Sequence, residues 1–179
     1  LALDLLSPQH PAAERLVQRH LQAAQRNGAD GMPRALIRMA YARALLEAER
    51  YSEAAEQLDI VTRAQPQMAQ AWLVQGTLQL QEARLEAAEE SLKRYLSLTE
   101  AAHDAATTSR SGDDEDANDR GRGRAQAFLQ LARIAEQRRD FAAANGWLDR
   151  ITDARDLLAA QLRRASIMAR QGRVDDARK

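Results

Sequence analysis

The sequence predicts an all-α protein, an α-solenoid of antiparallel helix hairpins with about three full repeats and partial units at both ends. Similar stretches recur at 50–55, 84–89 and 140–145, and a weaker copy lies at 173–178. The first two copies start 34 residues apart and the last two 33 apart, a period typical of paired-helix repeats. A composition rich in Ala and Leu, with 8 Gly and 4 Pro, favours helix throughout. No strands are expected.

The segment 1–33 precedes the first full repeat. An amphipathic helix is predicted from Pro11 to Arg26, because apolar residues recur there at spacings of three and four. The glycine-containing stretch 27–31 is expected to end that helix. The segment is predicted to be either the second helix of an earlier, partial repeat or a cap on the solenoid.

The region 34–99 is predicted to contain repeat units one and two. About 17 residues before each recurring stretch another apolar periodicity begins, so the unit is a pair of helices. In the second unit the two apolar faces are expected to meet across a short turn at 82–84. Ala42 and Gly76 take equivalent positions, where two helix backbones approach closely and a larger side chain would not fit.

The region 100–124 breaks the period, because the copies that begin at Arg84 and Asp140 are 56 residues apart, 22 more than the usual 34. The stretch from Thr107 to Arg124 has almost no apolar residues and cannot bury enough surface to offset the entropy of ordering it. We expect region 100–124 to be a mobile polar loop. Its alternating acidic residues do not make a calcium loop, because the required glycine and final glutamate are missing.

The region 125–179 is predicted to hold unit three and a truncated unit four. Ala132 and Ala165 take the small-residue position in these two units. Because the fourth copy stops within its second helix, we expect the chain to be a piece of a longer protein. Leu158, Leu162 and Ile167 are expected to lack part of their cover, which favours a homodimer of this piece.

The arrangement Trp72, Gly76, Ala88 and Leu92 resembles the tetratricopeptide repeat, and the resemblance covers roughly 34–179 apart from the insertion. It implies a superhelix whose first helices line a concave groove that takes a peptide or helix of another protein. Carrying over the offsets of the family gives the groove candidates Met39, Arg43, Leu46, Leu73, Thr77, Leu80, Leu129, Arg133, Glu136, Leu162, Ser166 and Ala169.

These groove candidates are largely apolar. Leu73 and Thr77 stand where members that clamp a terminal carboxylate carry Lys and Asn, so an amphipathic helix or an extended apolar segment fits better. The alternative is that the apolar candidates only pack neighbouring repeats against each other.

Composition excludes several other classes. The 26 basic and 26 acidic residues balance, so no overall field attracts nucleic acid, and no apolar run is long enough for a membrane span. The absence of cysteine excludes disulfides, thiol catalysis and thiolate metal sites. The three histidines have no partners at catalytic or metal-ligand spacing, and no phosphate-binding loop is present. We therefore expect no enzyme activity, no cofactor and no metal.

The predicted function is that of a non-catalytic scaffold that binds a protein or peptide partner in its groove. The alternative is a structural assembly subunit that self-associates or packs within a larger envelope or multi-protein complex. Only Lys93 and Lys179 are lysines among the 26 basic residues, a bias that suggests a bacterial source. The cytoplasm and the periplasm both remain open as the compartment.

Overall fold

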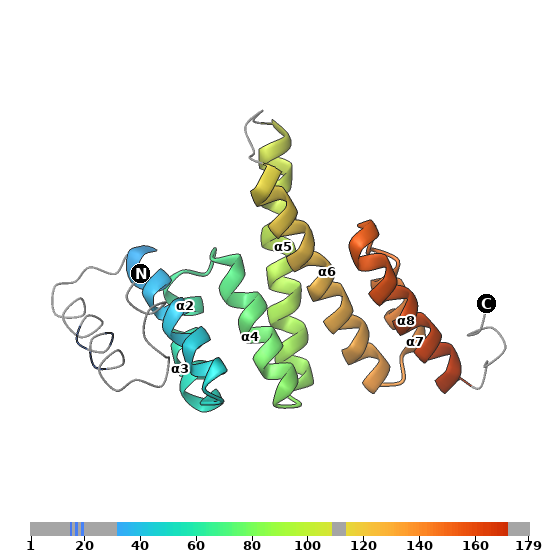
Figure 1. Ribbon diagram of the computed structural model, residues 1–179, viewed down its shortest axis with the longest axis horizontal. Helices are drawn as coiled ribbons and strands as arrows, with labels where there is room; N and C mark the ends of the chain where they lie inside the picture. The colour runs from blue at the N-terminus through green and yellow to red at the C-terminus, as the bar shows by residue number, and fades with distance from the viewer. Residues whose placement is uncertain (1–14, 16, 18, 20–31, 109–113, 172–179) are drawn as a thin grey trace. The chain divides into compact units, whose positions relative to one another are not determined.

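The structure is a computed structural model that describes residues 15, 17, 19, 32–108 and 114–171, with the backbone alone at 103–108, 114–120, 154 and 155. All regular structure in these residues is helical, which confirms the predicted all-α fold of antiparallel helix pairs (Figure 1). The helices are α2 (Met32–Glu47), α3 (Tyr51–Ala64), α4 (Ala69–Gln81), α5 (Leu85–Thr108), α6 (Asp114–Gln137), α7 (Phe141–Leu148) and α8 (Ala154–Arg170).

The chain divides into two compact units, Leu1–Leu78 and Gln79–Lys179, which are described separately below. The predicted leading helix and the last copied stretch lie largely outside the described residues. Of the leading segment, residues 15, 17 and 19 are helical, and the Val17 side chain is buried in the core of the first unit.

The three recurring stretches that the structure describes, at 50–55, 84–89 and 140–145, each follow the same helix-ending turn. Glu49, Ala83 and Arg139 adopt positive φ angles of 58°, 58° and 61°. The next residue then donates its N–H to a carbonyl five residues back, as Arg50 does to Leu45 at 2.9 Å. This left-handed ending satisfies carbonyl groups that the helix leaves unpaired, and it reverses the chain into the next helix. The repeated sequence is thus the start of each second helix.

In the first unit, α2 packs against α3 as the first helical pair. Leu58 and Val61 on α3 are fully buried, together with Ala42 on α2, the predicted small-residue position. At the edge of this core, the Gln75 amide donates to the Asp59 carboxylate at 2.6 Å. The pair is therefore held mainly by a packed apolar core.

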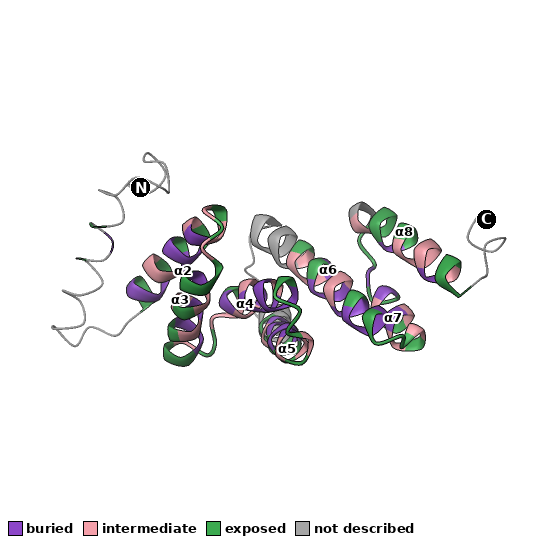
Figure 2. Ribbon diagram, turned by 90° about the horizontal axis from the view of Figure 1, so that it is seen from below, coloured by how far each residue is buried: buried purple, intermediate pink, exposed green. Residues whose placement is uncertain are grey.

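In the second unit, α6 lies at the centre and packs against α5, α7 and α8. Its apolar face buries Leu131 and Ile134, while α7 contributes Leu148 and α8 contributes Ile167. Figure 2 shows the buried positions of α6 in purple. The burial of Ile167 corrects the expectation that it lacks cover, because α8 turns this residue inward. Leu158 and Leu162 on α8 are exposed, as expected.

The expected loop at 100–124 is largely helical. Helix α5 continues to Thr108 and α6 already begins at Asp114, so this part of the prediction was wrong; residues 109–113 lie outside the described range. The low apolar content of this region limits what it can bury, but extending a helix that is already formed needs only favourable backbone propensity. Residues 100–106 and 114–120 are mostly Ala, Glu, Asp and Arg, and several of these residue types favour helix.

Candidate functional site

On α2, the three groove candidates differ in exposure. Arg43 is exposed, Leu46 is half-buried against the core, and Met39 is 5% exposed within it. Leu36, which sequence reasoning missed, is 57% exposed and lies two helical turns before Arg43 on the same face. The spacing of residues 36, 40, 43 and 47, all exposed, was the signal that could have identified this face.

On α4, the candidates are mostly enclosed. Leu73 is 4% exposed, and the half-buried Thr77 donates its hydroxyl to the Leu73 carbonyl at 2.8 Å. Leu80, which falls in the second unit, is 6% exposed. A ligand that bound to α4 would therefore contact few of these side chains.

On α6, Arg133 is exposed and Leu129 is half-buried, but the Glu136 carboxylate is buried. Arg163 Nε lies 3.0 Å from one oxygen of the Glu136 carboxylate, and Arg170 Nη1 lies 3.1 Å from the other. Among the described residues, neither carboxylate oxygen has a partner with hydrogen-bond geometry. Two guanidinium groups from α8 therefore neutralise a buried charge on α6. This arrangement gives Glu136 a structural use that joins the two helices.

On α8, an apolar strip faces solvent. Leu158 is 69% and Leu162 65% exposed, four residues apart and hence on one face, and Leu157 beside them is 37% exposed. The remaining candidates differ: Ser166 is half-buried and Ala169 is exposed. Large apolar side chains at such exposure are typical of a surface that another protein covers.

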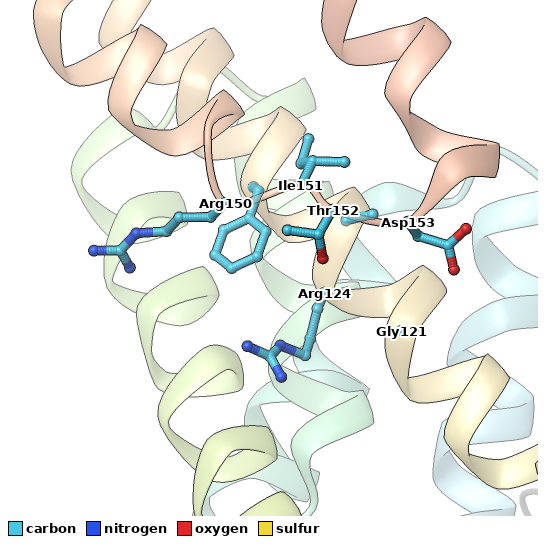
Figure 3. A pocket seen from close by; sticks show the side chains of 8 residues that line it. Gly121, Arg124, Arg150, Ile151, Thr152 and Asp153 are labelled. Carbon is cyan, nitrogen blue, oxygen red and sulfur yellow. The ribbon is translucent and has the colours of Figure 1, made fainter.

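The second unit also contains a cavity of about 280 Å³ that sequence reasoning missed (Figure 3). It lies between the first part of α6 and the segment that joins α7 to α8. The residues that line it are Gly121, Arg124, Ala125, Phe128, Arg150, Ile151, Thr152 and Asp153. It was missed because region 100–124 was expected to be a loop, which gave no reason to bring Arg124 and Arg150 together.

Aromatic rings support one side of this cavity. The Phe128 and Trp147 rings stack with their centroids 6.2 Å apart, and the Arg150 guanidinium lies 4.6 Å from the centre of the Trp147 ring. The attraction between a cation and an aromatic face favours this position of the guanidinium. Arg150 is thereby held at the edge of the cavity.

A charged cluster joins α5 to the turn that follows α6. Glu89 binds Lys93 at 2.6 Å and also Arg138, which reaches Glu86 at 3.3 Å. The hydrogen bond from Lys93 lowers the pKa of Glu89, partial burial opposes this, and Arg138 lowers the pKa further. The Glu89 carboxylate in turn raises the pKa of Arg138. This cluster stabilises the packing of α5 against its neighbour and presents no unused reactive group.

Metal binding depends on how the side chains of the described residues are arranged. No group of three His, Asp or Glu side chains there is arranged to hold a metal ion. His10 and His20 lie outside the described range, and for His103 the backbone alone is described. None of the described helices is long and apolar enough to cross a membrane.

The comparisons with known proteins agree with this architecture. The chain is similar to the crystal structure of MamA, with a TM-score of 0.66 and 15% identity over 91% of this chain and 79% of that one. It is also similar to a putative kinesin light chain of Podosopora anserina with nearly identical TPR-like repeats, with a TM-score of 0.60 and 17% identity over 95% and 92%. No curated protein matches the chain.

These likenesses define the class: the chain has the fold of a helical-hairpin repeat protein. The tetratricopeptide repeat model matches residues 39–109, which is less than half of the chain. This stretch is thus similar to tetratricopeptide repeats, which are generally modules for protein–protein interaction.

Proposed function

We propose that the chain is a non-catalytic scaffold that binds a peptide or helix of a protein partner through exposed side chains of first helices of its repeats, α2 in the first unit and α6 and α8 in the second. The observation that carries this proposal is the exposure of Leu162 and its neighbour Leu158 on α8, in a unit whose other large apolar side chains are mainly buried. Exposed apolar side chains of a first helix suit the apolar face of a bound segment.

Two exposed arginines refine the chemistry of the partner. Arg43 lies on the same face of α2 as the exposed Leu36, two helical turns away, and Arg133 lies on α6. A segment that presents apolar residues together with acidic ones would complement both kinds of side chain. The proposed contacts are therefore Leu36 and Arg43 in the first unit, and Arg133 and Leu162 in the second.

The test begins with selection of binders to the wild-type chain from a random 16-residue phage-displayed library. The affinities of the selected synthetic peptides are then measured by fluorescence anisotropy for wild type, Arg43→Glu and Leu162→Asp. Each variant is expected to weaken binding by about tenfold or more, which corresponds to about 1.4 kcal/mol. Arg43→Glu reverses a charge at the contact, and Leu162→Asp places a new charge in an apolar contact. Leu73 is not used, because a charge at this buried position would disturb folding.

The matched control is Arg63→Glu, which makes the same charge change on the second helix α3, where the Arg63 side chain is 81% exposed. It should leave the affinity within about twofold. Equal affinities for all variants, or no selected peptide that binds in solution, would contradict the proposal.

The apolar strip on α8 also favours the second candidate, a structural subunit that self-associates. In that case sedimentation would show a dimer of the wild-type chain that Leu158→Asp and Leu162→Asp both convert to monomer. A wild-type chain that remains monomeric at high concentration rules out this second candidate.

A further inference from the structure

The cavity of the second unit exists because α6 is longer than a first helix of the repeat needs to be. Phe128 corresponds to Trp72 of the preceding unit, so Ala125 corresponds to Ala69, the first residue of α4. Residues 114–124 are therefore an addition to the repeat. Gly121 and Arg124, which belong to this addition, form one wall of the cavity.

The charges around the cavity are separated in space. In Figure 3 the Arg124 and Arg150 side chains extend to the same side, whereas the Asp153 carboxylate extends to the opposite side. Asp153 lines the cavity just before α8. Its backbone carbonyl accepts hydrogen bonds from the N–H groups of Asp156 and Leu157, each at 3.0 Å. The side with the two guanidinium groups is therefore positive.

Arg124 and Arg150 make only weak contacts with other side chains. Arg124 Nη2 lies 3.9 Å from a Glu100 oxygen, and both side chains are partly exposed, so water screens this pair. Arg150 lies over the Trp147 ring and has no carboxylate partner among the described residues. Both guanidinium groups can thus exchange their present contacts for an incoming anionic group at little cost.

The size and the floor of the cavity restrict the ligand. A volume of about 280 Å³ lies just below the range for small-molecule sites, roughly 300–1,000 Å³. Phe128, Ala125 and Ile151 are buried apolar residues of the wall. The cavity suits one acidic side chain with an apolar neighbour better than a cofactor.

We propose that this cavity anchors an Asp or Glu side chain of a protein partner, with the carboxylate between Arg124 and Arg150 and an adjacent apolar residue against Phe128. The proposal rests on the proposed function in one respect, namely that the acidic group belongs to a protein. It adds a site at the α6 extension and the α7–α8 connection, separate from the proposed contacts on the first helices.

The test is a titration followed by the arginine Nε–Hε signals in NMR spectra, assigned with Arg124→Lys and Arg150→Lys. The probes are acetyl-Leu-Glu-Leu-amide, acetyl-Leu-Gln-Leu-amide and inorganic phosphate. The Glu peptide is expected to shift both arginine signals to saturation, and to bind about tenfold more tightly than the Gln peptide. Equal binding of the two peptides, absence of saturation, or tighter binding of phosphate overturns the proposal.

A pair of glycine variants tests the location of the site. A Cβ atom added at Gly121 or at Gly146 meets no atom within 4 Å apart from its chain neighbours and the backbone of its own helix, so both positions accept a side chain. Gly121→Leu puts a side chain at the wall of the cavity and should weaken the Glu peptide about tenfold or more. Gly146→Leu, on α7 away from the cavity, should leave its affinity within about twofold. Equal effects of the two variants contradict the location.

The failure of this proposal can be told apart from failure of the proposed function. Leu162→Asp is expected to weaken the selected peptides and to leave the Glu tripeptide unchanged, whereas Gly121→Leu acts on the tripeptide. Circular dichroism of each variant checks that the helices remain formed.

Discussion

At the residue scale, three residues other than glycine form the turn between the two helices of a repeat. Glu49, Ala83 and Arg139 all adopt the left-handed conformation that ends a helix, and each precedes a copied stretch. For residues with a side chain this conformation costs roughly 1–2 kcal/mol. The cost is offset by the hydrogen bonds that close the turn and by the burial of the helices it brings together.

Glycine substitutions at two nearby glutamates should have opposite effects. Glu49→Gly removes the strain of a positive φ, whereas the entropy that glycine adds to the unfolded chain partly offsets this gain. The net effect is expected to raise the free energy of unfolding by about 0.5–1 kcal/mol. Glu47→Gly, the control in the last turn of α2, is expected to lower it by about 0.5–1 kcal/mol. Urea denaturation measures both. The same sign for both variants would contradict the role of the left-handed turn.

The lowered pKa of Glu89 predicts an acid-dependent contribution to stability. Because the pKa in the folded chain lies below its ordinary value of 4.5, the stabilisation is present above that value and is lost as the pH falls through the folded pKa. Glu89→Gln should lower the free energy of unfolding by under about 1 kcal/mol at neutral pH, and less in high salt. The difference from wild type should shrink as the pH falls below 4.5 and should disappear once Glu89 is protonated in the folded chain.

Urea denaturation at a series of pH values checks this, with Glu90→Gln, at an exposed position of the same helix, as the control. A difference between wild type and Glu89→Gln that grows on acidification would exclude the proposed pairing.

At the element scale, the insertion at 100–124 lengthens the helices α5 and α6. Each has 24 residues, against 13 for α4, and their far ends project together beyond α7 and α8 (Figure 1). The added residues therefore lengthen a helical pair, and the lengthened α6 supplies part of the cavity wall.

Deletion of residues 107–121 distinguishes helix from loop. If these residues are largely helical, circular dichroism at 222 nm should lose total helical signal in proportion to the helical residues removed. A loop deletion would leave the total signal per molecule unchanged. The unchanged signal would contradict the extended helices.

At the scale of the whole molecule, the repeat architecture makes stability local. Each helical pair buries its own core: Leu58 is 0% exposed in the first unit, and Leu131 is 1% exposed in the second. In a solenoid each repeat contacts only its neighbours, so damage to one core weakens distant repeats less.

Leu58→Ala and Leu131→Ala should therefore show complementary patterns. Each is expected to cost about 2–5 kcal/mol locally, because a buried leucine leaves a cavity. Hydrogen exchange should become faster mainly in α2 and α3 for Leu58→Ala, and mainly in α6 and α7 for Leu131→Ala. Uniform acceleration across all helices in both variants would show a single cooperative unit instead.

The sequence by itself determined the helical-pair fold, because a fixed period and apolar spacings of three and four depend only on helix geometry. It also placed the small residues Ala42 and Ala132 correctly, since both are fully buried. These positions are set by local pattern, which needs no knowledge of neighbouring repeats.

Only the tertiary structure decided which candidate side chains face solvent. Met39 and Leu36 lie on adjoining sides of one helix, and packing of the neighbouring elements buries the first while it leaves the second exposed. Glu136 is buried because two arginines of α8 neutralise it, and the cavity forms because α6 begins at Asp114. Helical periodicity identifies a face, but burial depends on what packs against that face, which lies far away in the sequence.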